Sequence, residues 1–131
     1  MAGVYLDTSA LGRLVLDEPD AAAIGASLAR FDSIVSSRLL RIELHRLGLR
    51  AQVDAEEIER WLAGVALVPI DEAILAAAET ISPASVATLD AIHLATALEL
   101  NAAGHIDSLM TFDERLAEGA GEHGLTVLAP N

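Results

Sequence analysis

Four acidic residues stand at positions where a carboxylate needs a partner: Asp7, Glu43, Asp90 and Asp113. Two of them directly follow short apolar stretches, and the other two lie on apolar faces of stretches with helical periodicity. Acidic side chains are seldom buried without compensation. Because the chain contains no lysine and only eight arginines, the compensation we expect for converging carboxylates is a hard cation. An all-oxygen site of this kind suits Mg²⁺ or Mn²⁺.

Each of these acids also has a purely structural interpretation. Asp7 and Asp113 could each cap the helix that follows them. Asp90 could be a first-turn acid favoured by the helix dipole, and Glu43 could pair with an arginine along its own helix. These interpretations are weakest for Glu43 and Asp90, because both lie on apolar helix faces.

The acids must be positioned by an alternation of short apolar stretches and helical patterns. We expect strands at residues 3–6, 33–37, 66–70, 107–112 and 125–129. We expect helices at residues 9–16, 19–30, 38–51, 54–62, 72–80 and 88–101, and a last helix after residue 113. Pro19 suits the first turn of the second helix, and Asp54 with Glu57 forms a capping pattern. This alternation predicts an α/β fold with a mainly parallel five-stranded sheet, whose ligands bind beyond the carboxyl ends of the strands.

Length and composition indicate a single domain over residues 1–131 with an aliphatic core. Hydrophobic residues make up 53% of the chain and aromatic residues only 3%. There is no cysteine, which excludes disulfides and thiolate metal sites. Asp7 interrupts the first apolar stretch, which argues against a signal peptide, and no apolar run approaches the roughly 20 residues of a membrane span. We therefore expect a cytoplasmic protein.

The net charge of −12 bears on the choice of partner. An acidic surface opposes the long-range attraction of nucleic acid. It is better suited to a basic polypeptide or to bound cations.

Four segments carry a resemblance to a known family: YLDTSAL at residues 5–11, RIELHR at 41–46, TLDAIHLATAL at 88–98 and LMTFDERL at 109–116. In their order and spacing they resemble the four acidic motifs of the PIN-domain ribonucleases, and in particular of the VapC-type toxins of bacterial toxin–antitoxin pairs. The resemblance covers essentially the whole chain, and no acid of the family pattern is replaced. It implies a three-layer α/β/α PIN-like domain.

The resemblance further implies a metal-dependent endoribonuclease, in which metal-activated water cleaves RNA phosphodiester bonds. The acids that would hold one or two Mg²⁺ or Mn²⁺ ions are Asp7, Glu43, Asp90 and Asp113. The hydroxyl side chains that match positions near the family's site are Thr8, Ser9 and Thr111. Thr8 and Ser9 also stand at an expected helix start, where backbone N–H groups can bind a phosphate.

The resemblance implies a cognate antitoxin as partner, besides the RNA substrate and a second copy of the chain. Such an antitoxin would bind through an amphipathic segment whose basic residue reaches the acids. Leu49, Ile58 and Trp61 are candidates for its groove or for a homodimer surface. The sequence does not divide them between the two.

Other classes share parts of this pattern. A receiver-type signalling domain also has acids at strand ends, but it requires a lysine that this chain lacks. A haloacid-dehalogenase-type phosphatase requires a lysine and a second aspartate where this chain has Ser9. The alternatives to the nuclease are therefore a catalytically weak PIN-like binding module and, less favoured, a metal-dependent phosphatase.

We interpret the histidine and arginine residues below as structural or solvent-facing groups. His93, three residues after Asp90, is interpreted as a structural group or a support for the acids rather than as a catalytic histidine. Arg38, Arg41 and His45 share one face of the third expected helix, which we interpret as solvated in preference to RNA-binding.

Overall fold

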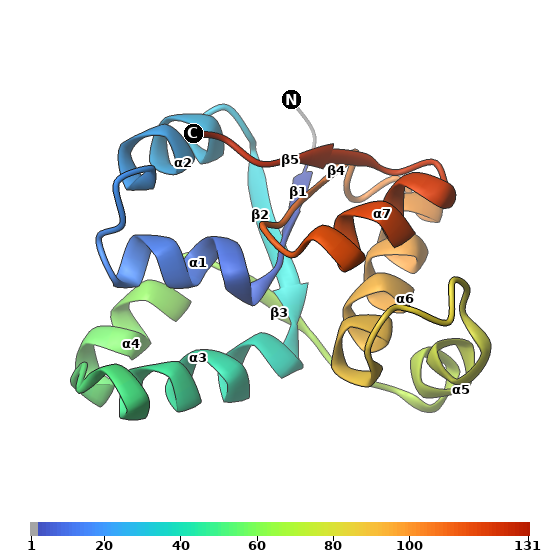
Figure 1. Cartoon of the computed structure of the whole chain (residues 1–131), viewed down its shortest axis with the longest axis horizontal. Coiled ribbons are helices and arrows are strands. Elements are labelled where there is room, and N and C mark those ends of the chain that lie inside the picture. The colour runs from blue at the N-terminus through green and yellow to red at the C-terminus, as the bar shows by residue number, and fades with distance from the viewer. Residues whose placement is uncertain (1–2) are drawn as a thin grey trace.

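The computed structural model describes residues 3–131, which contain five strands and seven helices (Figure 1). The strands are β1 (Gly3–Leu6), β2 (Ser33–Ser37), β3 (Ala66–Val68), β4 (Ser108–Met110) and β5 (Thr126–Leu128). The helices are α1 (Thr8–Val15), α2 (Ala21–Leu28), α3 (Arg38–Ala51), α4 (Ala55–Leu62), α5 (Glu72–Thr80), α6 (Thr88–Ala102) and α7 (Glu114–Glu122).

All five strands pair in parallel, in the order β3-β2-β1-β4-β5. The chain first builds β2 and β3 outward from one side of β1, and later adds β4 and β5 on the other side. The strand order therefore reverses between β1 and β4. At such a switch point the connections leave in opposite directions, which opens a crevice beyond the carboxyl ends of the two strands.

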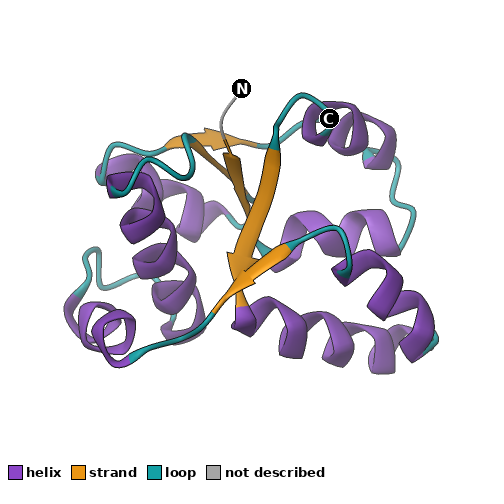
Figure 2. Ribbon diagram, turned by 180° about the vertical axis from the view of Figure 1, so that it is seen from behind, coloured by secondary structure: helices purple, strands orange, loops and turns teal. Residues whose placement is uncertain are grey.

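The sheet lies between two layers of helices, with α1 to α4 on one face and α5 to α7 on the other (Figures 1 and 2). The side chains of β1 point alternately to the two faces of the sheet, in agreement with this division. Val4 and Leu6 pack into the cluster formed with α1 to α4, whereas Tyr5 between them packs into the cluster formed with α5 to α7. The expected three-layer α/β/α fold is confirmed.

Most elements lie where the sequence predicts them, with differences at their ends. The helices at 38–51 and 72–80 have the expected bounds, but the strands expected at 66–70, 107–112 and 125–129 each pair over only three residues. The second helix begins at Ala21, so Pro19 precedes it instead of occupying its first turn. Asp54 is the N-cap residue of α4, as predicted, but its side chain makes no capping hydrogen bond.

Within residues 3–131, each helix is too short or too polar to cross a membrane.

Candidate active site

The four acids identified in the sequence come together at the switch point of the sheet. Asp7 and Asp113 follow the adjacent strands β1 and β4. Glu43 is on α3, which begins directly after β2, and Asp90 is in the first turn of α6. The negative charges of the other three acids all act on Asp90, which places the four carboxylates in one cluster.

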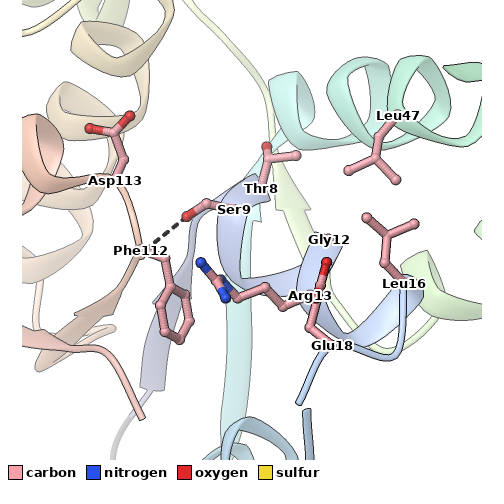
Figure 3. Close-up of a pocket in the computed structure, with 9 residues that line it drawn as sticks. All are labelled: Thr8, Ser9, Gly12, Arg13, Leu16, Glu18, Leu47, Phe112 and Asp113. Carbon is pink, nitrogen blue, oxygen red and sulfur yellow. Dashed lines mark hydrogen bonds between the residues drawn. The ribbon is translucent and has the colours of Figure 1, made fainter. Parts of the chain in front are cut away.

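Asp7 is buried, and one of its two carboxylate oxygens is fully engaged by hydroxyl groups. Its Oδ2 accepts hydrogen bonds from Ser9 Oγ and Thr111 Oγ1, both at 2.8 Å. Ser9 Oγ in turn accepts from the backbone N–H of Phe112 at 2.9 Å, which ties α1 to the segment after β4 (Figure 3). Within residues 3–131 the other oxygen, Oδ1, accepts no hydrogen bond and lies 3.7 Å from His93 Nε2.

Glu43 shows the same division between its two oxygens. Its Oε1 accepts from Thr8 Oγ1 and from His93 Nε2, each at 2.6 Å. His93 is fully buried, and its Nδ1 lies 2.6 Å from the hydroxyl of Tyr5. In the described part of the chain, Oε2 of Glu43 has no hydrogen-bond partner. Asp7 and Glu43 thus each keep one oxygen without a hydrogen bond in the described chain, and that of Asp7 lies near the His93 ring.

The electrostatics follow from this geometry. Burial disfavours the charge of Glu43, but the hydrogen bonds from His93 and Thr8 outweigh it and lower the pKa of that carboxyl. Burial also opposes an imidazolium at His93, yet the hydrogen bond to Glu43 and the charges of Asp7, Glu43 and Asp90 raise its pKa. Burial, followed by the charges of Asp7 and Asp113, raises the pKa of Asp90 to about 6. The cluster therefore carries uncompensated negative charge.

Asp113 has a structural role as well as a place in the cluster. It is the N-cap residue of α7, and its Oδ1 accepts from the backbone N–H of Leu116 at 2.9 Å. The structural interpretation of Asp113 is thus confirmed for one oxygen. Asp7 also stands at an N-cap position, but its side chain makes no capping bond there. Glu43 pairs with His93 and not with an arginine of its own helix.

A divalent cation fits the donors that these acids present. As the side chains lie, no group of three His, Cys, Asp or Glu residues between positions 3 and 131 converges closely enough to hold a metal ion alone. Mg²⁺ does not require such a group, because it usually keeps several waters and binds through one or two carboxylates. The oxygens of Asp7 and Glu43 that accept no hydrogen bond suit a hard cation of this kind, and so does Asp90, whose charged form is disfavoured while no cation is bound.

A pocket of about 520 Å³ lies beside the acids, between α1, α3 and the segment after β4 (Figure 3). Thr8, Ser9 and Asp113 form its inner end, and Leu16 and Leu47 form part of its wall. Arg13 also lines it. The guanidinium of Arg13 lies 4.3 Å from the ring centre of Phe112 and 3.0 Å from Asp20.

The structure also bears on sequence-based interpretations of residues outside this cluster. Arg41 and His45 both bond to Glu59 of α4, which fits the solvated face predicted for them. Ile58 is 1% exposed and belongs to the core, so the prediction that it lines a partner surface is wrong. Sequence reasoning missed Tyr5; its hydroxyl within an otherwise apolar strand was the available signal.

The charge on Asp90 gives a prediction about stability. Because burial and neighbouring charges raise its folded-state pKa from 3.8 to about 6, the folded protein binds more protons than the unfolded chain between these pH values. Stability should therefore fall as the pH rises through this range. At neutral pH in metal-free buffer, Asp90→Asn should raise the unfolding free energy by about 1 kcal/mol, allowing for solvent screening, and the melting temperature by about 3 °C.

Asp54→Asn is the matched control, since it removes the same charge from an exposed residue at a helix start. Calorimetric melting at acidic and neutral pH should show a gain for Asp90→Asn only at neutral pH, and little change for the control. If Asp90→Asn destabilises the protein at neutral pH, the carboxylate is a structural group and not part of a repulsive cluster.

The chain is similar to known proteins in both sequence and fold. Residues 4–122 match the PIN domain model. The chain is 37% identical over 132 residues to ribonuclease VapC46 of Mycobacterium tuberculosis (strain ATCC 25618 / H37Rv), covering 100% of both chains. It is 35% identical over 133 residues to ribonuclease VapC47 of M. tuberculosis (strain CDC 1551 / Oshkosh), covering 97% of this chain and 96% of that protein. Its fold is similar to a chain in the crystal structure of VapBC2 from Rickettsia felis bound to a promoter DNA fragment, with a TM-score of 0.67, 14% identity, and coverage of 98% and 99%.

Proposed function

This chain belongs to the PIN-domain family, and we propose that it is a metal-dependent endoribonuclease acting as the toxin of a toxin–antitoxin pair. One observation carries the proposal. Asp7 and Glu43 each engage one carboxylate oxygen with hydroxyl or imidazole donors and keep the other free, at the switch point where this fold binds ligands. Full-length relatives that bear the name ribonuclease support the reaction class.

In this proposal Asp7, Glu43 and Asp90 hold Mg²⁺ or Mn²⁺, and Asp113 binds it directly or through water. The bound ion would supply an activated water and charge stabilisation for phosphodiester cleavage. The protein's own contribution is positioning. Ser9 and Thr111 fix one oxygen of Asp7, and Thr8 fixes one oxygen of Glu43, so that each carboxylate keeps its other oxygen for the ion.

The pocket beside the acids suits the RNA strand. Thr8 and Ser9 begin α1, whose first backbone N–H groups have no partner within the helix and can bind a phosphate. Arg13 lies on the wall of the same pocket, where its guanidinium is paired with Asp20 and could exchange that partner for a phosphate. The strand would therefore reach the acids along α1.

The test is cleavage of RNA with analysis of the fragment ends. In Mg²⁺ or Mn²⁺ the protein should release fragments with 5′-phosphate and 3′-hydroxyl ends, because the attacking water displaces the 3′ oxygen and the phosphate stays on the 5′ oxygen of the downstream fragment. Excess chelator should abolish cleavage. Ends carrying 2′,3′-cyclic phosphate, or cleavage that persists in chelator, would contradict the mechanism, and absence of cleavage with intact metal binding would favour the non-enzymatic binding module.

The proposal includes protein partners and a cytoplasmic location. The antitoxin is supported by the similar fold found in the VapBC2 complex. A homodimer is supported by Ile42 and Leu49 on α3, which are 61% and 71% exposed and lie seven residues apart on one helix face. Exposed aliphatic side chains on the same helix face are typical of a surface that another chain covers.

A further inference from the structure

A row of hydrogen bonds joins the two helix layers near the carboxyl ends of the strands and ends on Glu43. Tyr5 lies on the central strand β1, His93 on α6 in one helix layer, and Glu43 on α3 in the other. The Tyr5 hydroxyl lies 2.6 Å from His93 Nδ1, and His93 Nε2 lies 2.6 Å from Glu43 Oε1. The two rings meet edge to face, with their centres 5.7 Å apart. Tyr5 and His93 are both completely buried.

Packing alone does not account for these polar groups. Tyr5 belongs to an otherwise apolar cluster, in which phenylalanine would fill nearly the same volume without burying a hydroxyl. Burying a polar group costs free energy unless it is hydrogen-bonded. The buried hydroxyl therefore depends on the hydrogen bond that it makes with His93 Nδ1.

The hydroxyl determines which imidazole nitrogen carries the proton. A tyrosine hydroxyl carries its proton at neutral pH and can donate it in a hydrogen bond. When His93 is neutral, Tyr5 donates to Nδ1 and the ring proton must be on Nε2, which then donates to Glu43. When His93 is charged, Nε2 carries a proton as well. In both states Glu43 Oε1 has a donor.

We propose that Tyr5 and His93 form a positioning unit for the metal site, in which Tyr5 fixes the Nε2–H tautomer of His93 and His93 holds Glu43 Oε1, leaving Oε2 for the cation. This inference rests on the proposed function. Both residues act through Glu43 and are not catalytic themselves. Without the hydroxyl, neutral His93 can adopt the Nδ1–H tautomer, whose Nε2 lone pair repels the carboxylate. Glu43 is then free to rotate away from the other acids.

The first experiment needs no metal. Proton–nitrogen NMR correlation of the histidine rings, at a pH where the imidazole is neutral, reports the tautomer of His93. The wild-type protein should show His93 protonated at Nε2. Tyr5→Phe, which removes only the hydroxyl, should give a mixture of the two tautomers. An unchanged Nε2–H form in Tyr5→Phe overturns the proposal.

The second experiment measures Mn²⁺ affinity by calorimetric titration at the same pH as the NMR measurement, where the imidazole is neutral. Tyr5→Phe should weaken binding about tenfold, as expected when a group supporting a metal ligand is lost. In the Glu43→Gln background the same change should have no further effect, because the group through which Tyr5 acts is already altered. His93→Gln, which can still donate an amide N–H to Glu43, should bind Mn²⁺ more tightly than His93→Leu.

Thr96→Val is the matched control. Thr96 is a buried residue on the same helix as His93, and its hydroxyl bonds only to the backbone oxygen of Ile92 in the described chain. It should lose stability as Tyr5→Phe does, but keep wild-type Mn²⁺ affinity. If Tyr5→Phe also keeps wild-type affinity, or weakens it equally with and without Glu43→Gln, the unit is structural only. Failure of the wild-type protein itself to bind Mn²⁺ or cleave RNA would instead contradict the proposed function, while the NMR result still decides the role of Tyr5.

Discussion

Asp7→Asn should reduce RNA cleavage about 1,000-fold, equivalent to about 4 kcal/mol of activation free energy. Asparagine has the shape of aspartate, and its side-chain oxygen can still accept from Ser9 and Thr111. What it lacks is the negative charge and the second acceptor oxygen, which is the one left free for the cation. The fold should therefore survive while the reaction is lost. Initial cleavage rates in saturating Mn²⁺, together with the melting temperature, measure both effects.

Asp107→Asn is a suitable control, because Asp107 is exposed and stands at the opposite end of β4 from the acids. It removes the same charge from the protein and should leave the cleavage rate within about twofold of wild type. A wild-type rate in Asp7→Asn would exclude Asp7 as a metal ligand. Equal losses in both variants would mean that overall charge, and not the position of the carboxylate, controls the reaction.

The fold was largely predictable because its elements have strong local signals. The β1 stretch GVYL is buried throughout, and Ser37 begins α3 by accepting a hydrogen bond from the backbone N–H of Leu39. Strands β3, β4 and β5 were predicted too long, because the apolar stretches continue past the residues that pair with neighbouring strands. β3 and β5 each have a neighbour on one side only, and their ladders are three residues long.

The acid cluster was predictable in part for a different reason. Asp7 and Asp113 follow strands that any parallel sheet would align at one edge. The partners of single atoms were not predictable. The contact between Tyr5 and His93 joins residues 88 positions apart. The hydrophobic periodicity of the sequence indicates only that each side chain faces the protein interior. The resemblance named the acids, but which oxygen of Asp7 and Glu43 is free depends on hydroxyl groups from two separate segments and on the imidazole of a third.

The net charge of the chain also links the site to its partner. Acids that lie close to one another with no lysine or arginine paired to them attract any cation that can reach them, whether a metal ion or a side chain. Within the described residues, Arg13 is the basic residue that lines the pocket, and Asp20 and Phe112 already engage it. An arginine or lysine supplied by another chain would therefore compete with metal for the same carboxylates.

Antitoxin bound to this chain should suppress RNA cleavage completely and weaken Mn²⁺ binding. The path is the groove between α1 and α3, where Leu16 and Leu47 provide an apolar wall that leads to Asp113 (Figure 3). An amphipathic segment can place its apolar side chains against these leucines and its basic side chain among the acids. Reversing the charge of that basic residue should restore both cleavage and Mn²⁺ binding, because the carboxylates are then released to the metal.

Leu16→Glu should weaken antitoxin binding at least tenfold, because it places a charge where an apolar side chain would be buried. Leu75→Glu on α5 is matched to it, since these leucines are 42% and 39% exposed, but it lies in the other helix layer and should bind antitoxin normally. Calorimetry with each variant gives the affinities, and Mn²⁺ titration of the complex gives the competition. Tight antitoxin binding that leaves Mn²⁺ affinity and cleavage unchanged would exclude inhibition by occupation of the acid cluster, and equal losses in the two variants would place the antitoxin elsewhere.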